Sequence, residues 1–504
     1  MSKDIYVFAD WIGMDEPVLV GLLTVDIIRG KEVFRFQYEG EWLHSYQAHP
    51  IDPELNLIRG PQFNPNSDNN KNFRVFMDSS PDRWGELLMK RREAVQARIE
   101  DRKPKRLLSA DFLLGVHDTH RMGGLRFKTS VDGDFLDNNT RLATPHISSI
   151  RELEHAALNL DKDSDINNEE YIKWLNMLIS PGSSLGGARP KACVIDGNEL
   201  WISKFPGRYD DRDMGAWEYL TYILAKKSGI EMSECKLIKL SSNHHTFLTK
   251  RFDRVLTPEM NLKRVHFSSA MTQLGYYDGE DDASYLELAD FISTQGACPE
   301  KDLKQLWRRI VFNIVVSNTD DHLRNHGFIL ESEGWRLSPA YDLNPEPDKN
   351  SLHLSVNESD NSLDLDLALE VASFFRVSQD EALDVISELY GYEIRKQGKI
   401  IQIYPSGIRT ETIPLNYLFV NRYGSSSTSI NSGGVSENDP NSGNSGGGNN
   451  SNSNNSNNSN SSNNSGNNQN GQNSQNSSSG INISTNNEAE FWKGFKETLE
   501  ALIG

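Results

Sequence analysis

The sequence predicts an α+β protein followed by a non-globular tail. Apolar residues alternate near the N-terminus, and a hairpin pattern fills residues 192–205, so strands are expected in both places. From Met214, and again beyond Leu286, apolar residues recur every three to four positions, which predicts helices. Past about Gly424 the chain consists almost entirely of Asn, Ser and Gly, with too little apolar surface to form a core.

The N-terminal region reads as a small β-rich unit that gives way to a helix. Gly30 and Gly40 mark turns between its strands. A helix start is expected at residues 81–88, where Pro81 precedes an apolar face. The charged segment 98–106 is typical of a solvated face or loop rather than a binding patch. The alternation is carried by Ile5, Val7, Val18, Val20, Leu22, Phe34 and Phe36.

In the second β-rich region, residues 192–195 and 200–205 flank a turn at 196–198, which predicts a hairpin. A helix follows it. The later, mainly helical part is interrupted at residues 317–325, where polar residues replace the periodic pattern. Such interruptions of a helical scaffold commonly carry chemistry.

Composition excludes several classes of protein. The formal net charge of -19 over 504 residues argues against a whole-chain electrostatic grip on nucleic acid. Cys193, Cys235 and Cys298 are scattered singly, so neither a zinc site nor a disulfide framework is expected, and a reducing cytoplasm is the natural location. No signal-peptide core and no apolar stretch long enough for a membrane span is present.

The C-terminal part divides into three segments. Residues 396–423 remain unassigned, and 424–484 are expected to form a disordered linker. Residues 485–504 regain a helical stripe through Trp492, Phe495, Leu499 and Leu502. This short helix either docks on the folded body or binds a groove as a tethered peptide, and the sequence leaves both alternatives open.

Residues suited to phosphoryl transfer occur in order along the chain. Segment 183–191, SSLGGARPK, is glycine-rich, so its backbone N–H groups could approach a phosphate, although two glycines before a strand are more often a plain turn. Lys204 ends a strand-like run, and Glu218 follows on the next helix. Kinases use this order to hold a lysine on the α- and β-phosphates, whereas a surface lysine and a solvated glutamate are the simpler interpretation of the pair alone.

Two acidic motifs follow. Asp320 and Asn325 are separated by four residues, as in the catalytic loop of kinases, where one loop brings a carboxylate to the acceptor hydroxyl and an amide oxygen to a metal. By itself, this dense polar loop could also be a capping turn or a calcium-like cluster. Asp342 follows a strand-like run where a second metal-binding aspartate is required. His322 is assigned a structural role in the loop.

At these residues the chain resembles the HipA family of toxin serine/threonine kinases from bacterial toxin–antitoxin pairs. The resemblance covers roughly residues 1–390. It is carried by SSLGGARPK at 183–191, KRFDR at 250–254, NTDDHLRN at 318–325, LSPAYDL at 337–343, SPDRWG at 80–85 and GGLRF at 123–127.

The resemblance implies a two-lobed, protein-kinase-like fold. Residues 1–130 would form the β-rich N-terminal subdomain, 131–255 the small nucleotide-binding lobe and 256–395 an all-helical C-lobe. Asp320 would be catalytic, Asn325 and Asp342 would bind Mg²⁺, and Glu218 would hold Lys204 on the phosphates. The other implied ATP contacts are Gly186, Gly187, Ala188, Arg189 and Lys191, with the backbone around Lys250 and Phe252 at the adenine. Ser184, or the adjacent Ser183, would be autophosphorylated.

The resemblance also implies the cofactors ATP and Mg²⁺ and a growth-arresting toxin that phosphorylates a protein, an aminoacyl-tRNA synthetase in studied members. A small DNA-binding antitoxin would be the partner, with DNA contacted only through it. Two rivals belong to other classes: a catalytically idle kinase-fold binding module or co-repressor, and a small-molecule phosphotransferase. Retention of Lys204, Asp320, Asn325 and Asp342 favours the active kinase over the first, and the motifs at 183–191 and 250–254 favour it over the second.

Overall fold

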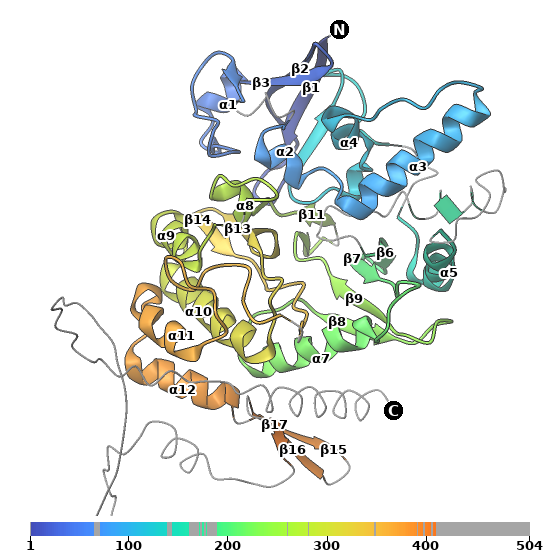
Figure 1. Cartoon of the computed structure of the whole chain (residues 1–504). Helices are drawn as coiled ribbons and strands as arrows, with labels where there is room; N and C mark the ends of the chain where they lie inside the picture. The colour runs from blue at the N-terminus through green and yellow to red at the C-terminus, as the bar shows by residue number, and fades with distance from the viewer. Residues whose placement is uncertain are drawn as a thin grey trace, which may run out of the picture. The chain divides into compact units, whose positions relative to one another are not determined.

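The structure is a computed structural model (Figure 1). It describes residues 2–64, 71–138, 144–160, 171, 174, 175, 178, 189–259, 261–280, 282–346, 349–390, 392–396, 399–404 and 407–409. All of these belong to one compact unit, and the second unit, Ile413–Ile481, lies outside the described residues. Among the described helices, none combines the length and the apolar character needed to cross a bilayer.

The N-terminal region is built on a five-stranded antiparallel sheet in the order β4-β3-β2-β1-β5. The alternation predicted from sequence is clearest in β3, where Phe34, Phe36 and Tyr38 are buried in turn. Helices α2 and α4 supply further residues to the same apolar core. The elements are β1 (Ser2–Ala9), β2 (Val18–Ile28), β3 (Lys31–Tyr38), α1 (Gly40–His44), β4 (Gln62–Phe63), α2 (Arg74–Asp78), α3 (Arg83–Ile99), α4 (Ser109–Gly115) and β5 (Leu125–Lys128).

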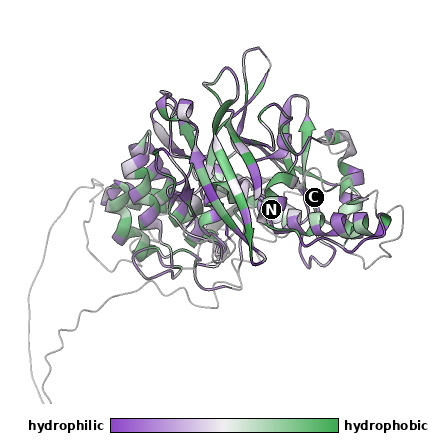
Figure 2. Cartoon of the chain, turned by 90° about the horizontal axis from the view of Figure 1, so that it is seen from above, coloured by the Kyte–Doolittle hydropathy of each residue, from purple (hydrophilic) through white to green (hydrophobic). Residues whose placement is uncertain are grey.

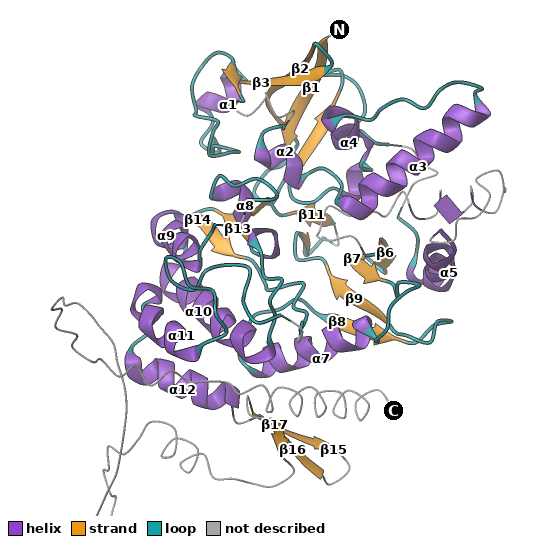
Figure 3. Ribbon diagram, viewed as in Figure 1, coloured by secondary structure: helices purple, strands orange, loops and turns teal. Residues whose placement is uncertain are grey.

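A second antiparallel sheet has the order β6-β7-β9-β8 and lies between two helical layers (Figure 3). Trp201 and Leu248 pack with α3 and α5 on one face, whereas Phe247 and Cys235 pack with Tyr222 on the other. The elements are α5 (Ile150–Leu160), β6 (Lys191–Asp196), β7 (Glu199–Lys204), α7 (Met214–Lys227), β8 (Cys235–Ile238) and β9 (Thr246–Lys250). The predicted hairpin and the helix that follows it are therefore confirmed.

The C-terminal part is mainly helical, but it is not all-helical as expected, because it also contains the sheet β12-β13-β14. Gly334 turns the β13–β14 hairpin with a φ of +136°, and Gly327 lets Phe267 approach its backbone. The elements are β10 (Arg254–Leu256), β11 (Leu262–Arg264), β12 (Phe267–Ser269), α8 (Ala270–Gln273), α9 (Tyr285–Gln295), α10 (Pro299–Val316), β13 (Gly327–Glu331), β14 (Gly334–Leu337), α11 (Leu365–Val371) and α12 (Gln379–Tyr390).

Hydropathy explains why these segments form a layered core. Polar and apolar residues stand side by side along the same helices and strands (Figure 2), so each element has one face to bury. Beyond α12, strands β15 (Tyr392–Lys396), β16 (Lys399–Tyr404) and β17 (Gly407–Arg409) pair antiparallel, so strands occupy the beginning of the segment left unassigned from sequence. The linker expected at 424–484 and the helix expected at 485–504 lie outside the described residues.

Candidate active site

Three charged side chains that are far apart in the sequence meet beside the second sheet. The Lys204 ammonium lies 2.5 Å from Glu218 Oε1 and 2.6 Å from Asp342 Oδ1. Their side chains are only 13%, 9% and 24% exposed, so these charges are largely shielded from water and compensate one another. The structure thus brings together three of the residues that the sequence singled out.

Local structure explains this meeting. Lys204 is the last residue of β7 and pairs with Phe247, so its side chain projects from the face that α7 covers. Asp213 caps the N-terminus of α7 by accepting from the amide of Ala216, and Glu218 lies in the second turn. Asp342 arrives from β14 in a left-handed conformation with a φ of +58°, which aims its carboxylate back at the sheet.

Burial and charge act in opposite directions on these groups. Burial alone would raise the pKa of Asp342, but Lys204 dominates and holds this pKa below its ordinary value. Burial would lower the pKa of Lys204, yet Asp342 and Glu218 raise it above the ordinary value. Asp342 and Lys204 are therefore both charged over the physiological pH range.

The loop between α10 and β13 is the polar interruption expected at 317–325. It begins where Ser317 ends α10 in a left-handed conformation with a φ of +53°. Asp321 anchors it from below, because its buried Oδ2 accepts from Tyr285 at 2.5 Å and from Asn313 at 2.7 Å and lies 2.7 Å from His326 Nε2. Burial would raise the pKa of Asp321, but His326 lowers it, so this anchor keeps its charge.

The anchored loop carries Asp320 and Asn325 in different environments. Asp320 is exposed, and its backbone carbonyl accepts from Asn325 Nδ2 at 2.9 Å. Asn325 is buried, and its Oδ1 has no hydrogen-bond partner within the described part of the chain. A buried oxygen without a partner is costly unless a ligand satisfies it.

The donor set fits a hard divalent cation. Asn325 offers the unpaired amide oxygen, and Asp342 offers a carboxylate that also accepts from Asn344 Nδ2 at 3.0 Å. Carboxylate and amide oxygens suit Mg²⁺, which usually takes one or two protein oxygens and completes its shell with phosphate and water. No group of three or more His, Cys, Asp or Glu is arranged for a metal in the described ranges, so a closed all-protein site is not formed there.

A pocket beside the Lys204 cluster extends along β9 toward Phe252. Its walls include Ile202, Tyr222, Phe247 and Leu343, which are apolar or aromatic, and the strand end at Thr249 to Phe252 forms one side. Such a pocket next to a paired lysine suits a flat apolar ring joined to phosphates. The ammonium of Lys250, which also lines this pocket, pairs with Glu199.

A second, larger cavity, with a volume of about 590 Å³, is lined by the polar loop 317–325. Asp320, His322 and Arg324 line it, together with Asp278 and the beginning of α3. Burial lowers the pKa of His322, so this imidazole is neutral at pH 7. The exposed carboxylate of Asp320 therefore faces a space large enough to admit a side chain of another molecule.

The glycine-rich segment lies mostly outside the described residues. This applies to Ser183, Ser184, Gly186, Gly187 and Ala188. Its end is described: the guanidinium of Arg189 forms a two-armed pair with Asp210 at 2.5 and 3.2 Å, and Lys191 Nζ lies 2.6 Å from Asp82 Oδ2 with only 1% of its side chain exposed. Both cations, expected at the phosphates, thus have carboxylate partners.

Sequence reasoning missed residues that support the site. The side-chain amide of Asn344 donates to Asp342 Oδ1, and the backbone amide of Asn344 donates to Asn318 Oδ1 at 3.1 Å. The sequence predicts a role for Asp320 but none for its neighbour Asp321. The sequence signal is partial, because Asn318 and Asp321 lie in the same polar loop as the predicted pair and Asn344 follows Asp342, but only the fold shows which of them are buried.

The KRFDR motif mainly joins the second sheet, β6-β7-β9-β8, to the N-terminal region. Asp253 is fully buried, pairs with Arg251 and Arg254 at 2.6 Å each, and accepts from the amide of Gly123 at 2.9 Å. Burial would raise the pKa of Asp253, but the two guanidinium groups hold it below its ordinary value.

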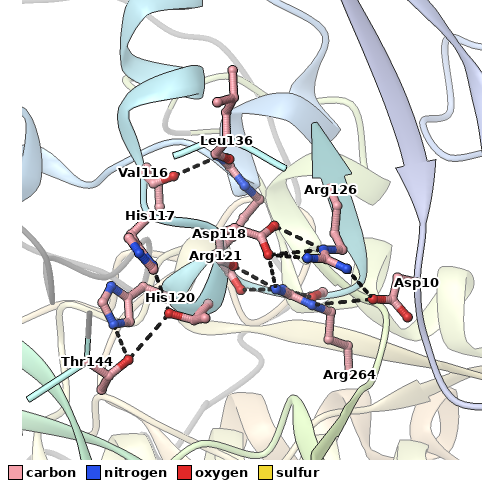
Figure 4. A network of polar contacts seen from close by, with 12 residues as sticks. Asp10, Val116, His117, Asp118, His120, Arg121, Arg126, Leu136, Thr144 and Arg264 are labelled. Carbon is pink, nitrogen blue, oxygen red and sulfur yellow. Dashed lines mark hydrogen bonds and ion pairs between the residues drawn. The ribbon is translucent and has the colours of Figure 1, made fainter. Parts of the chain in front are cut away.

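The same junction continues into a network of arginines (Figure 4). Asp118 accepts from Arg126 and Arg264, and Asp10 accepts from Arg126 at 3.0 Å. Arg121 is fully buried and donates to the carbonyls of Ser79, Leu113, Val116 and Leu136. Through Arg264 of β11, these contacts join the N-terminal region to the segment that follows the second sheet.

Residues 183–393 match the family model described as HipA-like C-terminal domain, and residues 410–504 match that of the Secretin N-terminal domain. The kinase-named protein Y4mE of Sinorhizobium fredii is 24% identical over 148 residues, and a kinase-named protein of Haemophilus influenzae is 29% identical over 182. The matches cover 28% and 32% of this chain. They span only 33% and 52% of these two relatives.

HipA of Shewanella oneidensis, solved with HipB and its operator DNA, matches in fold with a TM-score of 0.53 at 15% identity. The match covers 76% of this chain and 88% of that one. Fold and site together define a kinase-fold protein. Residues 183–393 therefore resemble the C-terminal domain of HipA-like proteins, and the kinase-named relatives and the shared fold agree with this resemblance. The expected α+β fold is thereby confirmed, apart from the small sheet in its C-terminal part.

Proposed function

We propose that the chain is an ATP- and Mg²⁺-dependent serine/threonine protein kinase that acts as the growth-arresting toxin of a toxin–antitoxin pair. One observation carries the proposal: Lys204 is held at 2.5 and 2.6 Å by Glu218 and Asp342, which come from two other parts of the chain. A kinase needs this arrangement to place a lysine on nucleotide phosphates next to the metal-binding aspartate.

Each residue then has a defined task. Lys204 binds phosphate oxygens, Glu218 orients Lys204, and the pocket along β9 takes the adenine. Asp320 accepts the proton of the acceptor hydroxyl. The hydroxyl oxygen bonds to the γ-phosphorus while the bond between this phosphorus and the departing ADP oxygen breaks. Asn325 and Asp342 would hold Mg²⁺, which neutralises negative charge on the phosphates when bound.

The proposal extends to control and partners. Phosphate on Ser184 or Ser183 would place up to two negative charges beside the nucleotide phosphates, so autophosphorylation would limit activity. The Shewanella HipA that shares this fold was solved with HipB and operator DNA, which supports a small DNA-binding antitoxin as partner and DNA contact through it. A protein that halts translation when phosphorylated, such as an aminoacyl-tRNA synthetase, is the proposed class of substrate, in the cytoplasm.

The test compares wild type with Asp320→Ala. With labelled ATP and Mg²⁺ we expect label on a serine of 183–184, and a loss of at least about a hundredfold in transfer in the variant, because a positioned general base contributes that much. Nucleotide affinity should be unchanged, since Asp320 lies outside the pocket along β9. The Asp320→Asn variant serves as a control for shape.

Two outcomes count against the proposal. If wild type neither binds ATP nor transfers phosphate, the chain is better described as a kinase-fold binding module. If candidate metabolites are phosphorylated and no protein is, it is a small-molecule phosphotransferase. Binding of ATP without any label would call for peptide mapping of residues 183–184 for phosphate acquired before purification.

A further inference from the structure

The beginning of α3 contacts the strand that follows the glycine-rich segment. Asp82 is the N-cap of α3, accepts from the amide of Gly85 at 2.8 Å and lies 2.6 Å from the ammonium of Lys191. Trp84 Nε1 donates to the carbonyl of Lys191 at 3.3 Å. The Asp82 and Lys191 side chains are 5% and 1% exposed, so this ion pair is a buried contact between α3 and the second sheet.

The next residue of α3 reaches the opposite side of the cavity. Arg83 Nη2 lies 3.3 Å from Asp278 Oδ2, and the other oxygen of Asp278 pairs with Arg324. Arg324 directly precedes Asn325, and its carbonyl accepts from Tyr341 at 2.8 Å, one residue before Asp342. A single carboxylate thus connects α3 to the loop that carries Asp320 and Asn325.

The N-terminal region also holds the segment that carries Asp278. Arg74 of α2 donates to the carbonyl of Tyr276 at 3.1 Å, and its guanidinium lies 4.1 Å from the ring centre of Tyr277. Glu280 accepts from the amide of Tyr277 at 2.7 Å and closes the turn. Asp278 is therefore a fixed point between the two arginines rather than a free side chain.

We propose that Arg83, Asp278 and Arg324 form a latch by which the N-terminal region positions the catalytic loop relative to the nucleotide-binding sheet. The inference rests on the proposed kinase function for its effect on rate. Arg83, Asp278 and Arg324 are 70%, 42% and 30% exposed. Ion pairs this accessible add little to the free energy of unfolding. We therefore expect the latch to affect the orientation of the loop and not the stability of the whole protein.

The test uses Asp278→Ala and Arg83→Ala, with Lys90→Ala as the matched control. Lys90 also forms an exposed ion pair on α3, with Glu86, but that pair stays within the helix. We expect Asp278→Ala to lower kcat about tenfold and to raise the Mg²⁺ concentration for half-maximal rate several-fold, because a loop that is no longer held misplaces Asp320 and Asn325. Arg83→Ala should give a smaller change, and Arg83→Lys should retain most of the rate.

Hydrogen exchange of residues 318–325 gives a readout that needs no catalysis. Exchange should accelerate several-fold in Asp278→Ala and stay unchanged in Lys90→Ala, with thermal midpoints close to wild type. Unchanged exchange and unchanged Mg²⁺ requirement in Asp278→Ala would overturn the latch even if the kinase is active. Faster exchange in a chain that transfers no phosphate would keep the latch and reject the proposed function. If Asp278→Ala fails to fold, the same two readouts on Arg83→Ala decide.

Discussion

At the scale of single residues, charge compensation determines which side chains of the site lie next to one another. Lys204, Glu218 and Asp342 are each costly to bury alone, and the ammonium of Lys204 compensates both carboxylates, which repel each other. Burial raises the pKa of Glu218 although Lys204 acts against it, which makes Glu218 the weakest-held charge of the three. The cluster is therefore most sensitive at Glu218.

Glu218→Gln is expected to lower kcat/KM for ATP about tenfold to a hundredfold, because Lys204 is then held by Asp342 alone and loses its orientation. Gln keeps the shape of the side chain, so the thermal midpoint should change little. Steady-state kinetics of phosphate transfer measure the effect. Glu199→Gln is the control, since Glu199 also pairs with a lysine of the same sheet, Lys250. Equal losses in both variants would contradict a special role for Glu218.

At the scale of elements, the connection between α10 and the polar loop 317–325 depends on one strained residue. Ser317 has a φ of +53°, a conformation that costs a residue with a side chain roughly 1–2 kcal/mol. Its backbone carbonyl nevertheless accepts from the amides of Thr319 and Glu346 and so fixes where the loop begins. The loop geometry is therefore set by the end of the helix that precedes it.

Ser317→Gly is expected to raise the free energy of unfolding by about 0.5–1 kcal/mol, because the relief of strain exceeds the extra entropy of glycine in the unfolded chain. Urea denaturation provides the measurement. Ser317→Ala removes the hydroxyl but keeps the strain, so its stability should stay near that of wild type. A destabilised glycine variant would show that the serine side chain, rather than the backbone, holds the cap.

At the scale of the whole molecule, buried arginines join the N-terminal region to the kinase core. Asp253 serves both Arg251 and Arg254, and those two arginines also donate to carbonyls of residues 119–121. Removing one partner of such a group leaves uncompensated charge in the interior. The loss of a single partner at this junction should therefore be strongly destabilising.

Asp253→Asn is expected to destabilise the protein by about 3–5 kcal/mol at pH 7, since two buried guanidinium groups lose their counter-charge. The folded pKa of Asp253 lies below its ordinary value of 3.8, so its contribution is present above that value and is lost as the pH falls through the folded pKa. The stability difference between wild type and variant should therefore narrow as the pH is lowered below about 5. Urea titrations at several pH values measure this difference in the free energy of unfolding. A difference that stays constant with pH would show that the charge of Asp253 is unimportant.

The residues predicted for catalysis differ in how they could be known. The order of Lys204, Glu218, Asp320, Asn325 and Asp342 predicts a site from sequence because phosphoryl transfer requires these side chains in fixed local contexts, and the structure brings the first two and Asp342 together. The position of Lys191 was not, because a lysine beside a glycine-rich segment suits a phosphate as well as a carboxylate. Its partner Asp82 lies 109 positions earlier, which no local pattern indicates.

Local patterns therefore determined the strands, the hairpin, the helix after it and the polar loop, because periodic burial and turn chemistry act between near neighbours. Only the tertiary structure decided the small sheet of the C-terminal part, the arginine junction around Asp253 and the latch through Asp278. These features depend on contacts between segments that are distant in the sequence. Such contacts arise when the segments are buried in a shared interior, and the spacing of residues along the chain does not indicate them.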